Sequence, residues 1–383
     1  MDNNDTRIKY IDGMRGLAVM IVLFSHLVVN FYPVLFFAKP DILSDQYPLL
    51  NIIASTPLNV FYYGYSAVMV FFFISGYAIT YNFFKQKDNN IASSVFRRYF
   101  RLTIPVFFSC LIVYILLKLH LFFGVEASPL SLSPTLNSYF NCDADFIDMI
   151  KLVLYNMYLG ADLEVLNCYN GVLWMMGYLF IGSIIVYSVL AIFGRANQKL
   201  RLIVYIIFVA LSHKSCLLAF ALAMILCDLD INNVLQKMNK IGIFLILLVG
   251  IYFSSFRSHD FPLYSYFSLQ FLPSFYNIIG AFLLFFAIHR SAFLIKILST
   301  KILLYLGKIS FSIYLIHSII VVSLSCYLYI LFRSTLNVSY NLSFFITSAI
   351  AIIVTIIFSH VFYNLIEIRS IDLSKSLYNL ISR

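Results

Sequence analysis

The sequence has few charged residues for its length. Only 11% of its 383 residues are Asp, Glu, Lys or Arg, while 62% are hydrophobic. Soluble domains carry about 25% charged and about 45–50% apolar residues. This chain therefore has too few polar groups to cover a surface that faces water. The shortage of charge excludes an ordinary soluble protein and indicates a protein whose solvent is the lipid bilayer.

Three further absences narrow the fold and the function. No long stretch alternates apolar and polar residues with the two-residue period of an outer-membrane strand, so we expect an all-α membrane protein. No phosphate-binding loop or DNA-binding motif accompanies the net charge of +9, so we expect no nucleic-acid partner. No residue spacing resembles a metal site, so we expect no metal.

Apolar stretches recur along almost the whole chain. A helical span needs roughly 20 mostly apolar residues, and the pattern predicts about ten spans. The fifth and sixth are short and adjacent, so the alternative for them is a pair of half-helices or one bent pair. The predicted spans are 16–37, 60–84, 101–123, 172–193, 201–213, 214–229, 240–256, 272–290, 309–333 and 342–366.

The basic residues predict the orientation of these spans. If the N-terminus is cytoplasmic, 20 of the 26 Lys and Arg residues fall on the cytoplasmic side, which is the bias of the positive-inside rule. Both termini are then cytoplasmic. No small-residue cleavage site follows the first apolar stretch, so we interpret 16–37 as a retained span and not as a signal peptide. We expect residues 1–383 to form one transmembrane domain.

One long loop, 124–171, is expected on the outer side of the membrane. It is acidic, and apolar residues at helical spacing predict a short helix near 146–159. The loop holds Cys142 and Cys168, whereas the other four cysteines lie in predicted spans. In an oxidising compartment these two would form a disulfide. The alternative is a pair of free thiols packed against aromatic rings.

Two ionisable residues lie at the start and near the middle of the first predicted span. Arg15 and His26 are eleven residues apart, so they share one face of a helix, roughly 16 Å apart along its axis. A neutral histidine is well suited to accept a proton near pH 7, and ionisable residues inside spans usually serve function. The alternatives are a packing role for His26 and an interfacial anchor for Arg15.

Five motifs follow one another along the whole chain. They are Asp12-Gly13-Met14-Arg15-Gly16-Leu17-Ala18 with His26; Phe71-Phe72-Phe73-Ile74-Ser75-Gly76-Tyr77; Arg97-Arg98-Tyr99-Phe100-Arg101-Leu102 with Pro105; the segment 306–317, which ends in Tyr314-Leu315-Ile316-His317; and Tyr363 to Glu367 as Y-x-x-x-E. In this order they resemble the acyltransferase 3 family of membrane-bound O-acyltransferases.

One position departs from the family pattern. Many members carry W-S-L-x-x-E in a middle span, whereas here Trp174 is followed by M-M-G-Y and Leu179 stands where the acid would be. This departure puts a role for a second-site carboxylate in doubt. It also argues against the branch of the family that has a fused extracytoplasmic domain.

The resemblance implies a reaction and its location. An acyl group, with acetyl as the expected one, would pass from cytoplasmic acetyl-CoA to a sugar hydroxyl of a lipid-linked or surface polysaccharide such as O-antigen. The expected location is the bacterial inner membrane. The sequence specifies neither the sugar nor the oligomeric state.

The resemblance also implies roles for single residues. His26 would be the general base, and an acyl-histidine intermediate is the alternative. Arg15, Arg98 and Arg101 would hold the phosphates of coenzyme A, because the forked guanidinium matches phosphate oxygens. The alternative for the 97–101 cluster is membrane topology alone. The candidates for binding substrate or the oxyanion are Ser75, Tyr77, Trp174 and His317, the last with a structural role as its alternative.

A transporter or flippase for an acylated or lipid-linked sugar is the second function class. Transporters usually show inverted repeats with broken helices in matching halves, and the sequence shows no such halves. The short pair 201–213 and 214–229 is the only hint of one. A structural protein without chemistry is the third class, and polar residues in ordered motifs argue against it.

Overall fold

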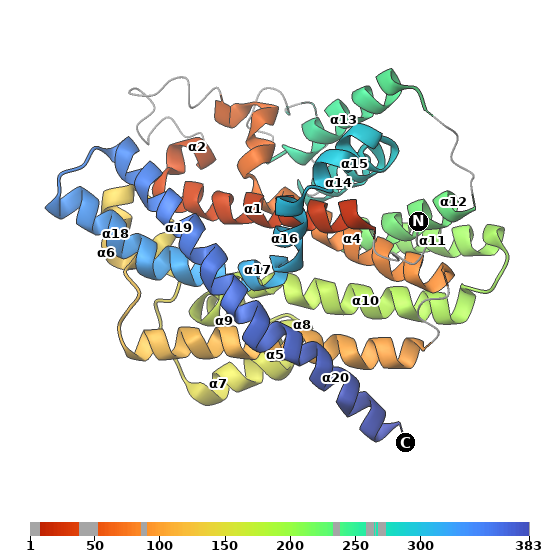
Figure 1. Ribbon diagram of the computed structural model, residues 1–383, viewed down its shortest axis with the longest axis horizontal. Helices are drawn as coiled ribbons and strands as arrows, with labels where there is room; N and C mark the ends of the chain where they lie inside the picture. The colour runs from red at the N-terminus through yellow and green to blue at the C-terminus, as the bar shows by residue number, and fades with distance from the viewer. Residues whose placement is uncertain are drawn as a thin grey trace. The chain divides into compact units, whose positions relative to one another are not determined.

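The computed structural model describes residues 8–37, 53–85, 90–232, 238–257, 264, 266 and 273–382. Within these residues all regular structure is helical and no strand occurs (Figure 1). The all-α fold class is therefore confirmed. The chain divides into two compact units. The first unit comprises 1–21, 55–95 and 181–310, and the second comprises 22–54, 96–180 and 311–383.

The first unit is a set of apolar helices around α4. In this unit α12 and α14 pack against α4, while α13 packs against α14 and α11 against α12. α1, α5 (Ile91–Lys118), α10 and α17 (Ser310–Ile320) each contribute residues to both units, and α5 and α17, which lie mostly in the second, are given with it. The elements with residues here are α1 (Lys9–Phe31), η2 (Pro57–Tyr62), α4 (Gly64–Phe84), α10 (Trp174–Phe193), α11 (Gln198–Ser212), α12 (Leu218–Ile231), α13 (Lys240–Ser254), α14 (Pro273–Arg290), α15 (Ala292–Leu298) and α16 (Lys301–Lys308).

Two of the sequence motifs meet in the first unit, where α1 lies against α15 and α16. A Cβ atom added at Gly13 would overlap the carbonyl oxygen of Leu298. One added at Gly307 would overlap the carbonyl oxygen of Asp12. Only glycine lets two backbones approach so closely, and membrane helices use small residues for this purpose. The glycines of both motifs therefore set the contact between these helices.

The second unit contains the remaining helices. In it α18 packs against α6 and α19. Its elements are α2 (Pro33–Phe37), α5 (Ile91–Lys118), α6 (Gly124–Ser131), η3 (Leu136–Ser138), α7 (Phe146–Lys151), η4 (Leu152–Asn156), α8 (Met157–Leu159), α9 (Leu163–Tyr169), η5 (Gly171–Leu173), α17 (Ser310–Ile320), η7 (Val321–Ser325), α18 (Cys326–Ile330), η8 (Leu331–Thr335), α19 (Tyr340–Phe362), η9 (Tyr363–Glu367) and α20 (Ile368–Ile381).

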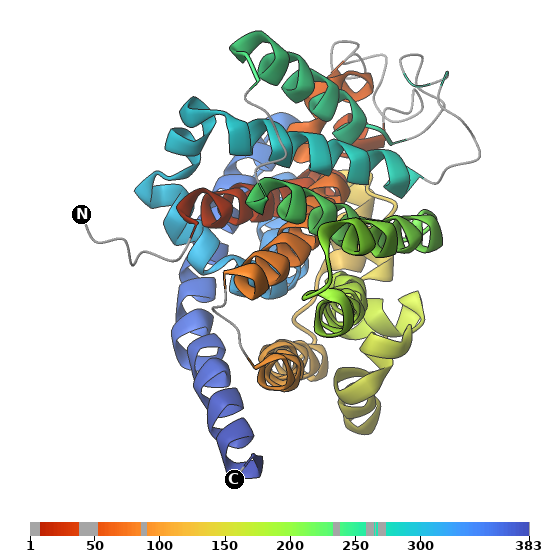
Figure 2. The same ribbon diagram turned by 90° about the vertical axis from the view of Figure 1, so that its right-hand side faces the viewer.

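The C-terminal helices form the longest continuous element. α19, η9 and α20 make one rod that ends at the C-terminus, as Figures 1 and 2 show. η9 is a π-helical turn, and its five residues are those of the Y-x-x-x-E motif. π-helical turns inside helices often occur at functional sites. The motif therefore marks an irregularity in the helix as well as a particular set of side chains.

Six helices among the described residues are long and apolar enough to cross a membrane. They are Lys9–Phe31, Gly64–Phe84, Ile91–Lys118, Gly171–Phe193, Ser310–Thr335 and Tyr340–Ile381, and a bent pair, Ser274–Arg290 with Ala292–Leu298, could add a seventh. The predicted spans 201–213, 214–229 and 240–256 fall on α11, α12 and α13, which have only 14 or 15 residues. Multi-pass character is thus supported, while the count of ten and the cytoplasmic termini stay predictions.

The 124–171 loop is more regular than a simple connection. It contains α6, α7, α8 and α9, and α7, η4 and α8 are continuous over residues 146–159, where the sequence predicts a helix. Cys142 and Cys168 are joined by a disulfide, with their Cα atoms 5.7 Å apart. The alternative of two free thiols is therefore not what the structure has. The bridge closes the part of the loop that contains this helix.

Candidate active site

The second unit brings together two histidines that the sequence singles out. The centroid of the His26 ring on α1 lies 4.8 Å from that of the His317 ring on α17, and the rings are inclined by 61°. His26 also lies edge-on to Tyr139, with 6.5 Å between centroids. Tyr314 contacts the other side of the pair, 5.8 Å from His317. Residues 291 positions apart in the sequence thus form one imidazole pair.

The hydrogen bonding of His317 assigns its tautomer. Its Nδ1 lies 3.0 Å from the carbonyl oxygen of Ile313, and a carbonyl can only accept. In the neutral ring Nδ1 therefore carries the hydrogen, and Nε2 carries the lone pair. That Nε2 is buried and has no hydrogen-bond partner among the described residues. A buried acceptor without a partner costs about 1–3 kcal/mol, so it calls for an explanation, and a proton or substrate is a direct one.

The ring nitrogens of His26 likewise lack hydrogen-bond partners among the described residues, and its side chain is only partly buried. Its contacts are with the rings of Tyr139 and His317. A histidine used only for packing would be expected to bond at least one ring nitrogen. The pair therefore offers nitrogen atoms to a ligand.

A polar brace holds the helix that carries His317. The buried Asn170 donates from Nδ2 to the carbonyl of Leu315 over 3.0 Å and accepts from Ser318 Oγ over 2.8 Å. The hydroxyl of Tyr314 donates to the carbonyl of Val172 over 2.6 Å. These bonds attach α17 to the segment just before α10. Sequence reasoning did not identify Asn170, although a lone Asn at the edge of an apolar span was a usable signal.

Trp174 begins α10 directly after that brace. Its ring is partly buried and lies 6.1 Å from the ring of Tyr178 in the next turn. The indole can only donate a hydrogen bond. Trp174 therefore lies in the second unit, close in sequence to the residues that fix α17, and it stays a candidate for holding a developing oxyanion.

Three sequence motifs meet at Glu367 in the second unit. Ser312 Oγ, from the motif that ends in His317, donates to Glu367 Oε2 over 2.6 Å. Glu367 belongs to the π-helical turn η9, and the charge of Arg101 on α5 acts on its carboxylate. The S-F-S and Y-x-x-x-E motifs are thus joined by one hydrogen bond, and the R-x-x-R motif acts on this bond through the charge of Arg101. The sequence gives each motif separately and does not indicate this contact.

Two of the three arginines expected to bind phosphate lie on α5. Arg98 and Arg101 are three residues apart on this helix, so their side chains project from the same face. Arg98 is half-buried and Arg101 is exposed. The face they share is accessible to an anionic ligand.

The other expected site residues, Arg15, Ser75 and Tyr77, lie in the first unit. Arg15 is paired with Asp12 over 3.4 Å, and one third of its side chain is exposed. Ser75 is buried within α4. The hydroxyl of Tyr77 donates to Asp230 Oδ2 over 3.4 Å, which gives Tyr77 a partner within this unit.

A charged cluster in the first unit was missed from the sequence. Asp230, which follows the predicted span 214–229, binds His289 Nε2 over 2.9 Å and Arg290 Nη2 over 2.7 Å. The other ring nitrogen of His289 bonds the hydroxyl of Tyr10 over 2.5 Å. Burial acts to raise the pKa of Asp230, but the hydrogen bond from His289 and the nearby positive charges outweigh it, so the pKa is lowered. The sequence did contain a signal for this cluster, because an acidic residue directly follows one predicted span and His289 and Arg290 end another.

No metal centre is apparent within the described ranges. They contain no group of three or more His, Cys, Asp or Glu side chains placed to hold an ion.

Comparison with known proteins shows the family to which the chain belongs. The acyltransferase 3 family model, described as an acyltransferase domain, matches residues 8–363. The chain is also 21% identical over 429 residues to a protein named O-acetyltransferase PaAT-1 from Phomopsis amygdali, and the match covers 98% of this chain and 85% of that protein. No solved structure matches.

Proposed function

Because the chain belongs to the acyltransferase 3 family, we propose that it transfers acetyl from cytoplasmic acetyl-CoA to a sugar hydroxyl. The acceptor is a lipid-linked or surface polysaccharide such as O-antigen, and the location is a bacterial inner membrane. The observation that carries the chemistry is the imidazole pair, in which the lone-pair nitrogen of His317 is unused beside His26. The O-acetyltransferase name of a relative supports the class of reaction.

The proposed reaction uses His26 as the general base. His26 takes the proton of the acceptor hydroxyl while the oxygen attacks the thioester carbonyl. The tetrahedral intermediate then collapses, the C–S bond breaks, and the departing CoA thiolate takes the proton from His26. The products are the acetyl ester and free CoA thiol. Trp174, Ser75 and Tyr77 are the candidates to donate a hydrogen bond to the oxyanion.

His317 is the proposed positioning residue for this base. Its Nδ1–H is fixed by Ile313, so its Nε2 can accept the N–H of His26 and leave the other His26 nitrogen as the base. The two rings touch without a hydrogen bond between them. Catalytic hydrogen bonds are often long before substrate binds and shorten in the reacting complex.

Of the three arginines that the sequence indicates for the donor, Arg15 lies in the first unit, and Arg98 and Arg101, in the second, would hold the phosphates. The excess of Lys and Arg on the expected cytoplasmic side agrees with a donor that approaches from the cytoplasm. Each guanidinium can form two parallel hydrogen bonds to phosphate.

The test uses the purified protein with labelled acetyl-CoA and lipid-linked glycan from a strain that lacks the gene. His26→Ala should slow transfer by about 10²–10⁴-fold while CoA still binds. Arg98→Ala and Arg101→Ala should weaken CoA binding by about 10-fold to 100-fold, the loss expected for one charge-assisted hydrogen bond. Lys85→Ala is the control, because it removes an equal charge after α4.

Three results would contradict this proposal or a part of it. Transfer by His26→Ala within a few-fold of wild type would remove His26 as the base. A wild-type protein that moves glycan across a vesicle membrane without consuming acetyl-CoA would be a flippase instead. Unchanged CoA affinity in both arginine variants would show that these residues serve topology only.

A further inference from the structure

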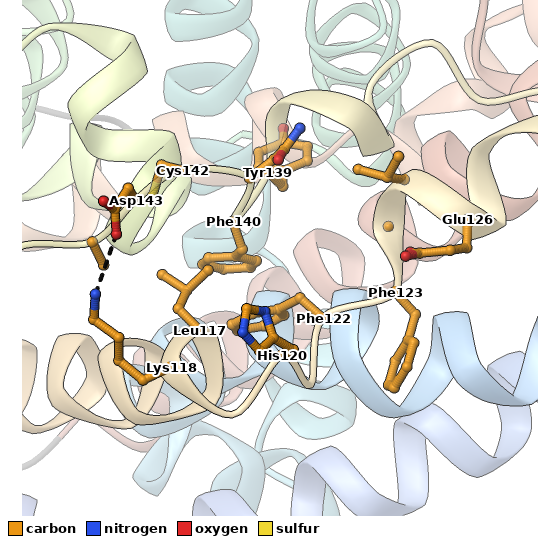
Figure 3. A pocket seen from close by; sticks show the side chains of 14 residues that line it. Leu117, Lys118, His120, Phe122, Phe123, Glu126, Tyr139, Phe140, Cys142 and Asp143 are labelled. Atoms are coloured by element: carbon orange, nitrogen blue, oxygen red, sulfur yellow. Dashed lines mark hydrogen bonds and ion pairs between the residues drawn. The ribbon is translucent and has the colours of Figure 1, made fainter.

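The second unit contains a cavity of about 440 Å³ that the proposed chemistry leaves unassigned. It lies between the end of α5 and residues 139–144 of the disulfide-bearing loop. Figure 3 shows Lys118 and Glu126 on opposite sides of it, with the rings of Phe122 and Phe140 between them. Its volume falls in the range of about 300–1,000 Å³ that is usual for small-molecule sites.

Two residues of the cavity wall have a costly backbone conformation. His120 has φ 53° and Phe140 has φ 52°, both in the left-handed region. Each such non-glycine residue costs of order 1–3 kcal/mol, and these conformations cluster at ligand sites. The described residues include four non-glycine positions with positive φ, and two of them line this cavity. The wall therefore has a shape that the local sequence alone would not favour.

Several contacts hold this shape. The disulfide of Cys142 anchors the 139–144 segment, and the N–H of Phe140 donates to the carbonyl of Asn167 over 2.9 Å. The rings of Phe122 and Phe140 are stacked with centroids 4.4 Å apart. Lys118 is paired with Asp143 over 3.2 Å across the rim. A wall fixed before the ligand arrives loses less entropy on binding.

The lining has the chemistry of a saccharide site. Phe122 is only partly buried, so the ring face that does not stack on Phe140 can meet the C–H face of a sugar. Glu126, Asn141 and Asp143 offer oxygens that accept from hydroxyl groups. Two carboxylates and one ammonium line the cavity. The lining would therefore repel an anionic sugar more than a neutral one.

We propose that this cavity binds a neutral sugar unit of the acceptor glycan. Tyr139 lines the cavity, and its ring also contacts that of His26. Tyr139 therefore separates a saccharide held here from the imidazole pair by one ring, with 6.5 Å between its centroid and that of His26, and the sugar beyond it in the glycan would reach the base. The inference rests on the proposed function, because it takes the acceptor of that reaction to be a glycan.

The experiment measures acceptor use and donor use separately. The variants are Glu126→Gln and Phe122→Ala, with Glu164→Gln and Phe146→Ala as matched controls in the same loop but outside the cavity. The acceptor KM should rise about tenfold in Glu126→Gln, as expected when one hydrogen bond to a charged group is lost. The controls should keep the wild-type KM. Slow release of CoA without acceptor should be unchanged in all four.

A binding measurement keeps this inference separate from the proposed reaction. The probe is the glycan released from the deletion strain, titrated by ligand-observed NMR, and the same glycan after oxidation of its primary hydroxyls to carboxylates. Neutral glycan should bind wild type and the controls at least tenfold better than it binds the cavity variants. The oxidised glycan should bind wild type at least tenfold more weakly than the neutral one.

Each outcome decides one of the two proposals. Wild-type transfer with an unchanged acceptor KM in both cavity variants overturns the cavity assignment and leaves the reaction standing. If the wild-type protein transfers no acetyl group, the proposed function fails, and the NMR titration alone tests whether the cavity binds a sugar. Equal glycan binding by wild type and cavity variants then overturns the cavity assignment. Equal binding of neutral and oxidised glycan overturns the stated selectivity.

Discussion

Each unit contains a histidine in a polar setting, and the two settings differ in how completely they are bonded. In the first unit both nitrogens of His289 are engaged, one by Tyr10 and one by Asp230. In the second unit His317 uses only Nδ1, and its buried Nε2 has no partner among the described residues. His26 bonds none of the described residues at all.

The difference separates stability from chemistry. A partly buried histidine with both ring nitrogens bonded, such as His289, offsets the cost of its burial with hydrogen bonds, and its ring has no nitrogen left for a substrate. In the His26–His317 pair, ring nitrogens lack hydrogen bonds to the described residues, and this costs folding free energy. A bound ligand or a transferred proton would supply the missing bonds. On this argument the His289 cluster holds helix ends together, whereas the His26–His317 pair is the one to which we assign the proposed reaction.

The largest expected effect is a loss of acetyl-transfer rate when the histidine pair of the second unit is changed. His317→Ala should lower kcat of acetyl transfer by about 10²-fold or more, because the base loses the group that orients it. If the two histidines act together in one step, the double variant with His26→Ala and His317→Ala should be no slower than His26→Ala alone. The measurement is kcat for labelled acetyl transfer at saturating donor and acceptor.

Two comparisons test whether this effect belongs to the pair. His360→Ala, an exposed histidine on α19, should keep kcat within a few-fold of wild type. His289→Ala should lower the unfolding midpoint in detergent and leave kcat of the folded fraction nearly unchanged. A kcat loss in His289→Ala equal to that in His317→Ala would remove the distinction between the two units.

A second prediction concerns the backbone contact in the first unit. Gly13→Ala and Gly307→Ala should each lower the free energy of unfolding by about 3 kcal/mol, because the new Cβ overlaps a carbonyl oxygen that cannot move independently. Gly242→Ala is the matched control. Its nearest neighbours are the side-chain ends of Asn239 and Met238, which can shift. Thermal unfolding in detergent that shows all three variants equal would contradict the assigned contact.

Local patterns were sufficient for much of the fold. Helical spacing of apolar residues located the helix at 146–159, and the choice of the two loop cysteines gave the bridge between Cys142 and Cys168. Both depend on residues near one another in sequence and on a period set by the backbone. The motif containing His26 and the motif ending in His317 likewise named the two rings that meet.

Contacts between distant residues were not accessible in the same way. The bond from Ser312 to Glu367 and the bond from Asn170 to Leu315 join residues 55 and 145 positions apart. No local period encodes such a pair, since it depends on how helices pack. The division into two units and the π-helical form of η9 are also packing results. Hydropathy also located the short apolar helices α11, α12 and α13, but helices of 14 or 15 residues are shorter than the roughly 20 residues that a span needs.

The smallest expected effect is a pH-dependent loss of stability, and it tests whether the charged cluster around Asp230 in the first unit stabilises the fold. Asp230 bonds His289, Arg290 and Tyr77, and its pKa is lowered in the folded protein. A carboxyl with a lowered folded pKa contributes stability above its unfolded pKa of about 3.9, and this contribution is lost as pH falls through the folded pKa.

Asp230→Asn should therefore be less stable than wild type by about 2 kcal/mol at pH 7, the loss expected for hydrogen bonds to a charged group. The gap should stay constant down to about pH 5 and close below about pH 4, as wild-type Asp230 takes up its proton. Asp372→Asn, an exposed acid on α20, is the control and should show no gap at either pH. Thermal unfolding in detergent between pH 7 and pH 3 measures both. A gap for Asp230→Asn that does not change with pH would mean that the carboxyl contributes through shape and not through charge.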